Sequence, residues 1–155
     1  MSGQPHDQYI KYVPKGRTMQ RISRVHTWLY RLTGGRIGGY ADRLNFLLLT
    51  SVGRKSGLER TTPLPFWEHP ERSGAYVSVG SNGGRDAHAA WFHNVNARPE
   101  VEIQIRSRRF SATARVATAD ERERLWKHIV AQQPRYDDYQ AQTQREIPVV
   151  VFEAQ

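Results

Sequence analysis

The spacing of apolar and polar residues predicts a chain made mainly of β-strands joined as hairpins. Short apolar runs or strict alternation mark six strands, over residues 46–49, 60–67, 75–81, 101–105, 110–116 and 147–152. Neighbouring strands linked by tight turns pair in antiparallel fashion. A sheet this small with one packed face tends to curl towards a barrel. We therefore expect a mainly β, or α+β, antiparallel barrel of about six strands.

Three helices are expected between these strands. Residues 17–32 repeat apolar positions at steps of three and four, through Ile22, Val25, Leu29 and Leu32. This stripe is expected to pack on the body of the same domain. Further helices are expected over residues 87–96 and 118–132, the second starting at a capping box of Thr118 and Glu121.

The returning strand over residues 60–67 contains Pro63 and Pro65. Proline has no N–H to donate to a ladder, and two prolines two apart face the same way. We expect this strand to lie at an edge of the sheet or to carry a bulge.

The composition indicates one ordinary domain of 155 residues, with residues 1–16 as a flexible arm and 17–33 as a basic amphipathic helix. The absence of cysteine excludes disulfides and thiolate chemistry. No signal peptide or bilayer-length apolar run is recognised, so a cytoplasmic protein is expected. The histidines have no ligand spacing that would indicate a metal site, and no G-x-S-x-G elbow indicates a hydrolase.

A formal net charge of +8 favours acidic partners. Nucleic acid is not expected, because neither an exposed aromatic sheet pattern nor a helix-turn-helix pair is present. An anionic membrane face is the alternative partner for the first helix, which carries Trp28 at the margin of its stripe and several arginines elsewhere. A polyanionic ligand is the third option.

Two glycine-containing loops are candidates for ligand binding. Gly53–Gly57 places Arg54, Lys55 and Ser56 between two glycines, a pattern that suits an anion held by backbone N–H groups and cations. The alternative is a hairpin turn with solvated cations. The second loop, residues 81–86, leads into the expected short helix. Tyr136 and Tyr139 are three apart and form either a core-rim pair or the wall of a pocket.

Taken together, several segments resemble the deazaflavin-dependent nitroreductase family, whose members are split β-barrels that bind coenzyme F420. The segments are LLTSVGRKSG (48–57), RTTPL (60–64), VGSNGG (79–84), AWFHN (90–94) and PRYDDY (134–139), with HTWLY (26–30) and IPVVV (147–151) extending the similarity over nearly the whole chain. Their order and spacing make the combined match specific.

The resemblance implies a set of cofactor-binding residues. The glycine turn would hold the coenzyme's phosphate, the returning strand would border the deazaflavin and its tail, and the later segments would line the rest. These positions are Arg54, Lys55, Ser56, Arg60, Thr61, Thr62, Pro63, Leu64, Pro65, Val79, Gly80, Ser81, Asn82, Ala90, Trp91, Phe92, His93, Asn94 and Tyr136. Ser81 and Tyr139 match positions near the reacting end and are the expected catalytic residues.

The resemblance also implies the chemistry, a hydride transfer from reduced F420 to a flat electrophile of the quinone or nitroaromatic type. The chain departs from the family at Asn82, where members often have Lys, and at Pro65 and Gln133, which are Tyr in the best-known member. These departures leave two alternatives open. One is a non-catalytic binder of F420, a lipid or a fatty acid, and the other is an FMN-dependent split-barrel oxidase.

Overall fold

The computed structural model describes residues 17–155. The expected N-terminal arm, residues 1–16, lies outside the described residues. The elements follow in the order α1 (Arg17–Thr33), β1 (Tyr40–Ala41), β2 (Leu44–Val52), β3 (Glu59–Glu68), β4 (Ala75–Val79), η2 (Asn82–Gly84), α2 (Ala90–Ala97), β5 (Glu100–Ile105), β6 (Arg108–Val116), α3 (Ala119–Gln132), α4 (Arg135–Ala141) and β7 (Val149–Ala154).

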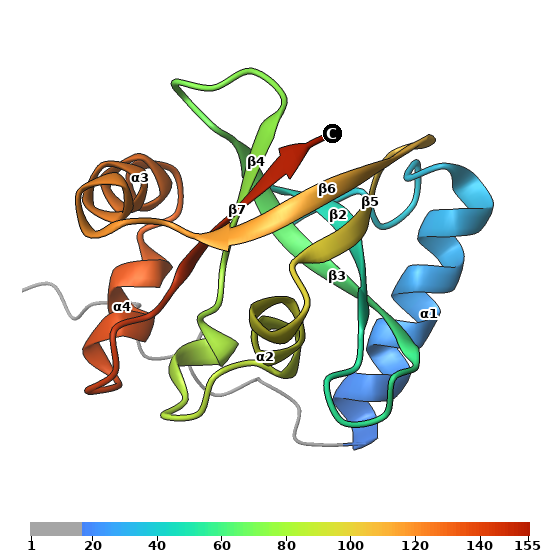
Figure 1. Cartoon of the computed structure of the whole chain (residues 1–155), viewed down its shortest axis with the longest axis horizontal. Helices are drawn as coiled ribbons and strands as arrows, with labels where there is room; N and C mark the ends of the chain where they lie inside the picture. Colours follow the sequence, from blue (N-terminus) through green and yellow to red (C-terminus); the bar gives the residue numbers. More distant parts are fainter. Residues whose placement is uncertain (1–16) are drawn as a thin grey trace, which may run out of the picture.

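Six of the strands close into an antiparallel barrel, which confirms the expected architecture (Figure 1). The order in the sheet is β1-β2-β3-β4-β7-β6-β5, and β2 pairs again with β5, for example Leu49 opposite Ile103. The two-residue strand β1 is an addition at the edge of β2. In Figure 1, α3 and α4 lie on one side of the barrel and α1 lies on the other.

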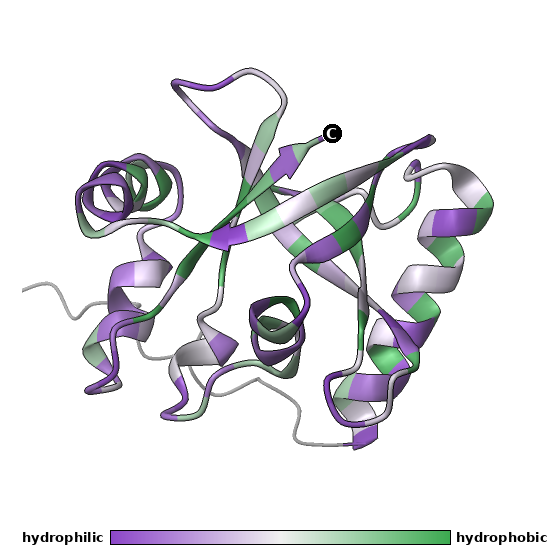
Figure 2. Ribbon diagram, viewed as in Figure 1, coloured by the Kyte–Doolittle hydropathy of each residue, from purple (hydrophilic) through white to green (hydrophobic). Residues whose placement is uncertain are grey.

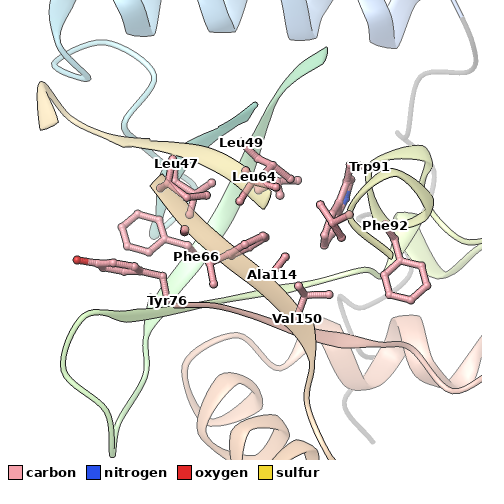
Figure 3. Packing of buried hydrophobic residues seen from close by; sticks show 14 residues of the cluster. Leu47, Leu49, Leu64, Phe66, Tyr76, Trp91, Phe92, Ala114 and Val150 are labelled. Atoms are coloured by element: carbon pink, nitrogen blue, oxygen red, sulfur yellow. The ribbon is translucent and has the colours of Figure 1, made fainter. Parts of the chain in front are cut away.

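The alternation along the strands divides the apolar side chains between two cores. The barrel interior holds one cluster, in which Leu47, Leu49 and Phe66 meet Trp91 and Phe92 from α2 (Figure 3). The second cluster lies between the outer face of the sheet and the helices α3 and α4. On β4, for example, Tyr76 belongs to the interior cluster, whereas Ala75 and Val77 belong to the outer one. Helix α2 therefore closes one end of the barrel.

The two prolines of β3 lie where the strand has a strand neighbour on one side. β2 pairs with β3 from Glu59 to Phe66, with Pro63 opposite Leu48 and Pro65 opposite Phe46. β4 pairs with β3 only at Trp67 and Glu68. The prolines therefore cost no ladder hydrogen bond on the open side, and the expected edge position is confirmed.

Helix α1 packs in the opposite sense to the one predicted. Three residues of its predicted inner stripe are exposed, Ile22 by 50%, Val25 by 58% and Leu32 by 67%, and only Leu29 is half-buried. Trp28 at the margin of the stripe is 62% exposed. The helix instead buries Tyr30, with His26 half-buried on the same face. The polar anchors explain the reversal. The Tyr30 hydroxyl donates to the Phe46 carbonyl (3.0 Å) and accepts from the Arg106 N–H (2.6 Å).

Several expected boundaries differ from the observed ones; the third strand ends at Val79 rather than Ser81, which leaves Ser81 in the following loop. The short helix begins at Ala90 rather than 87, which leaves His88 in the preceding loop. The segment containing Tyr136 and Tyr139 folds as the separate helix α4. The last strand begins at Val149 rather than 147, because Pro148 cannot donate to the ladder.

Candidate functional site

One cavity of about 940 Å³ lies between α1, the β2–β3 loop, the start of β3 and α2. Its lining includes many of the predicted cofactor residues, namely Arg54, Lys55, Ser56, Arg60, Thr61, Thr62, Ala90, Trp91, His93 and Asn94. Trp91 is 93% buried and also contributes to the barrel core. The cavity therefore combines a cationic wall with an aromatic surface.

The β2–β3 loop is fixed by short polar contacts. The Gly57 N–H donates to the Gly53 carbonyl (2.8 Å), and Gly57 has a φ of 70°, which favours glycine. A Cβ at Gly53 would lie 2.6 Å from Ser56 Oγ and 3.2 Å from the Leu58 carbonyl oxygen, so a side chain there would displace Ser56. The buried side chain of Asn94 accepts from the Arg54 N–H (3.0 Å). Asn94 thus ties α2 to the loop, and the adjacent cations stay exposed at the cavity.

The strand that borders the cavity is also held by side chains. Thr61 Oγ1 lies 2.9 Å from Thr50 Oγ1 and accepts a hydrogen bond from the Arg31 guanidinium (2.9 Å). Because Arg31 belongs to α1, this contact joins the helix to the wall of the cavity. The position of α1 over the site is therefore coupled to β3.

Helix α1 contributes lining residues that sequence reasoning missed: Met19, Gln20, Ser23 and Arg24. Among residues 17–155, the cationic side chains of the lining are Arg24, Arg54, Lys55 and Arg60, and no Asp or Glu lines this cavity. The basic charge of α1 was evident in the sequence and indicated an acidic partner. Its place over the cavity was hidden because the face that packs inwards was predicted wrongly.

Two histidines line the cavity together. The rings of His88 and His93 approach edge to face with centroids 5.8 Å apart. His88 precedes the helix, so helical spacing does not apply to it. Burial lowers the pKa of His88, and the nearby positive charge of Arg145 and His93 lowers it further.

The remaining predicted cofactor residues are not in the lining of this cavity. Leu64 and Phe92 are in the barrel core, and Pro63 and Pro65 are half-buried in β3. Val79 packs against the outer core. Gly80, Ser81 and Asn82 lie in the loop after β4, which approaches α4.

The loop after β4 has an unusual backbone. Asn82, Gly83 and Gly84 have φ values of 48°, 64° and 76°, and the Gly84 N–H donates to the Ser81 carbonyl (2.9 Å). A Cβ at Gly84 would lie 3.0 Å from the Tyr139 carbonyl oxygen, so the loop sits directly on α4. Asn82 suits the left-handed conformation, and its amide donates to the Ala87 carbonyl (2.9 Å). Its side chain closes the loop where relatives were expected to have Lys.

Tyr136 and Tyr139 have different environments. Tyr136 is 5% exposed in the outer core, edge-on to Trp67 with ring centroids 5.5 Å apart, and burial raises its pKa. Tyr139 is half-buried and perpendicular to Tyr136 at 5.6 Å. Tyr136 therefore has the packing of the core-rim alternative, while Tyr139 lies beside the Ser81 loop. Gln133 is buried and donates to the Asp42 carbonyl (3.0 Å).

The family model described as F420H(2)-dependent quinone reductase matches residues 22–154. The chain belongs to this family. It is 38% identical over 136 residues to F420H(2)-dependent quinone reductase Rv1261c from Mycobacterium tuberculosis, a match that covers 85% of this chain and 89% of that protein. Membership confirms the expected resemblance, the oxidoreductase class and reduced F420 as the coenzyme of the family.

Two similar solved structures support the fold. A structure described as an F420-H2 dependent reductase (FDR-A) is 39% identical, with a TM-score of 0.61, and covers 70% of this chain and 93% of that chain. A structure described as a domain-swapped dimer is 33% identical, with a TM-score of 0.64, and covers 88% of this chain and 99% of that chain. The expected split barrel is therefore confirmed for this reductase.

Proposed function

We propose that this protein reduces a quinone with a hydride from F420H2. The observation that carries the proposal is the cavity in which Arg24, Arg54, Lys55 and Arg60 converge beside Trp91, with no carboxylate from the described part of the chain in the lining. The phosphate and polyglutamate tail of F420 require such a basic surface, and its ring requires an aromatic wall. Family membership and the name of the mycobacterial relative support the same reaction.

The chemistry of the side chains suggests which residue binds which part of the coenzyme. Arg54 and Lys55 hold the phosphate by charge and by the fork of the guanidinium. Thr61, Thr62 and Trp91 border the ring and fix its approach. When bound, reduced F420 supplies the hydride. The protein contributes binding, alignment and electrostatics rather than a covalent nucleophile.

Titration with F420, followed by quenching of tryptophan fluorescence, tests the cofactor assignment. We expect micromolar or tighter binding to the full-length protein. Replacing Arg54 or Lys55 by Ala is expected to weaken binding about tenfold or more, because each loses a charge-assisted contact. Arg98→Ala is the matched control, since Arg98 is exposed and outside the cavity lining. Absence of binding by the wild-type protein would exclude the proposed function.

Turnover tests the two alternatives to a reductase. Oxidation of F420H2 by a water-soluble quinone is the expected result. Binding of F420 without turnover of any quinone or nitro compound would favour the non-catalytic binder. A yellow protein that retains FMN on purification would favour the flavin oxidase.

We assign the hydrogen bond to the substrate oxygen to Ser81 or Tyr139. The Ser81 loop sits on α4 beside Tyr139, which brings the two hydroxyl-bearing residues to one part of the fold. A hydroxyl there stabilises negative charge as it develops on the oxygen, and water or Tyr139 returns the proton. Ser81→Ala and Tyr139→Phe should each lower kcat, by roughly a hundredfold for the residue that makes the bond. Unchanged kcat in both variants contradicts this assignment.

We further propose that α1 docks the protein at an anionic membrane surface, where quinones reside. Within residues 17–155 none of the helices has both the length and the apolarity needed to cross a bilayer. Hydrophobic residues nevertheless recur along α1 (Figure 2). Ile22, Val25 and Trp28 are exposed on this helix. Residues 17–41 contain five arginines and no acid. This composition suits a helix lying in a headgroup region.

Co-sedimentation with vesicles tests the docking. Binding is expected to vesicles that contain phosphatidylglycerol and to be much weaker with purely zwitterionic vesicles. Val25→Glu should abolish binding, because the carboxylate would enter the interface. Val116→Glu is the matched control, since Val116 is 45% exposed on β6. Equal binding of both variants contradicts the assignment of the α1 face.

A further inference from the structure

Arg145 connects the cofactor cavity to the loop that carries Ser81. It lies between α4 and β7, and its guanidinium donates to the carbonyls of Ser81 (2.8 Å), Arg85 (2.8 Å) and Gly80 (3.3 Å). The same Nη1 lies 3.1 Å from Nδ1 of His88. One side chain therefore binds three carbonyls of a strained loop and a histidine in the cavity wall.

The contact between Arg145 and His88 fixes the state of the imidazole. A guanidinium has only donors, so Nδ1 of His88 must be the acceptor and carry no proton. The remaining ring proton then belongs to Nε2, and His88 is neutral. The groups that face it are Arg145, His93 and the Phe92 ring, with centroids 4.8 Å from Phe92 and 5.8 Å from His93. None of these stabilises an imidazolium, in agreement with the lowered pKa of His88.

The Nε2–H of His88 has no hydrogen-bond partner among residues 17–155, although the residue is half-buried. His88 lines the cavity assigned to F420, and the other wall of that cavity carries the cations. A fixed neutral donor at this place is complementary to an acceptor oxygen of the ligand and avoids the cost of ionising a crowded imidazole.

We propose that His88 is a cofactor-binding residue, donating from Nε2 to an acceptor oxygen of F420, and that Arg145 is the residue that positions it. The inference rests on the proposed function for the identity of the ligand. Through its bonds to Gly80 and Ser81, Arg145 also fixes the backbone of the proposed catalytic loop relative to the bound coenzyme.

Two substitutions at His88 separate the ring nitrogens. His88→Asn keeps an acceptor near Nδ1 and loses the donor at Nε2, whereas His88→Gln places an amide donor near Nε2. We expect His88→Asn to bind F420 about five- to thirtyfold more weakly and His88→Gln to retain most of the affinity. Titration with the deazaflavin chromophore lacking phosphate and tail shows whether the oxygen that accepts from His88 belongs to the ring or to the phosphate and tail. A loss with both ligands indicates the ring, and a loss with F420 alone indicates the phosphate or tail. His88→Asn with wild-type affinity overturns the proposal.

A spectroscopic measurement on the protein without coenzyme is independent of the proposed function. Long-range ¹H–¹⁵N correlation spectra distinguish the two neutral imidazole tautomers and the imidazolium. We expect the Nε2–H tautomer for His88 in the wild type at pH 7, and a mixture in Arg145→Gln. An Nδ1–H tautomer or an imidazolium in the wild type overturns the proposal. If the tautomer is as expected but F420 does not bind, the proposed function fails and the Arg145–His88 contact remains.

Discussion

At the scale of single residues, Glu121 is a buried carboxylate outside the cavity that depends on its hydrogen-bond partners. Its carboxylate accepts two hydrogen bonds from the Arg115 guanidinium (2.6 and 2.8 Å) and one from His69 Nε2 (3.2 Å), while its side chain is only 10% exposed. The Glu71 N–H donates to Nδ1 of His69 (3.2 Å), which leaves the ring proton on Nε2. Chiefly because of Arg115, the pKa of Glu121 falls to about 2.

Glu121→Gln should destabilise the protein by about 2–4 kcal/mol at pH 7, because Arg115 is left without its buried counter-charge. A carboxylate with a lowered pKa stabilises the folded state above its ordinary pKa of 4.5, and this contribution is lost as the pH falls towards 2. Urea unfolding from pH 7 to pH 2.5 measures both effects. The wild type and the variant should converge below pH 4.5. A gap that stays constant with pH contradicts the assignment.

Glu123→Gln is the matched control for this experiment. Glu123 is on the same helix and pairs with Lys127 (2.9 Å), but its side chain is 68% exposed. An exposed pair at this spacing is screened by solvent, so the substitution should leave the unfolding midpoint nearly unchanged.

Not every residue of the candidate site was predictable from the sequence. Arg54, Lys55 and Ser56 were found because a glycine-bounded turn with two cations is a local signal. Asn94 was also named, but its contact with the Arg54 N–H depends on how α2 meets the β2–β3 loop. His88 and Arg145 are 57 positions apart, and no local pattern links them. Contacts between distant loops arise when the barrel closes, and the spacing of residues along the sequence does not predict them.

At the scale of elements, α1 shows why amphipathic periodicity does not reveal which face is buried. The period of three and four predicted the helix, but the apolar stripe lies outside and a polar face lies inside. The inner face is held by Tyr30 and by His26, whose Nε2 lies 2.5 Å from the Gly38 carbonyl. These hydrogen bonds to backbone carbonyls fix which face of the helix meets the barrel, and they leave most of the stripe exposed. The reversed helix is thus consistent with the proposed docking to a membrane.

Tyr30→Phe should loosen α1 without altering the barrel. The substitution removes the donor to Phe46 and the acceptor of the Arg106 N–H, and the expected cost is about 1–3 kcal/mol. Hydrogen exchange should show faster opening of amides in α1, with β5 and β6 protected as in the wild type. Tyr40→Phe is the control, because Tyr40 is 62% exposed. Uniformly faster exchange in every strand would show that Tyr30 supports the whole fold instead.

At the scale of the whole molecule, an antiparallel barrel was predictable from the sequence. The pair of strands that closes the barrel was not. Alternation in β5 and β6 and hairpin spacing predicted the ladders, and the prolines of β3 correctly indicated an edge. The pairing of β2 with β5, Leu48 opposite Gln104, joins strands separated by two others and a helix. This pairing brings α2 to the end of the barrel beside the β2–β3 loop, so the cavity is a product of closure.

The net charge of the molecule and the cations of the cavity together predict that binding of the coenzyme depends on salt concentration. The chain carries +8, and four cations of the described residues line a cavity to which those residues contribute no carboxylate. Raising NaCl from about 20 to about 300 mM shortens the Debye length from roughly 20 Å to roughly 6 Å. We expect the Kd for F420 to rise by about tenfold over this range, because most of the attraction to its phosphate and tail is long-range.

Fluorescence titrations at a series of salt concentrations measure this change in Kd. The variants show how much of the salt dependence each cation contributes. Arg54→Ala should show a shallower dependence than the wild type, since one of the converging charges is absent. Arg98→Ala should run parallel to the wild type, because Arg98 lies outside the lining. The deazaflavin chromophore without phosphate and tail should bind with little salt dependence. Equal slopes for F420 and this chromophore would mean that the cationic wall does not face the charged end of the coenzyme.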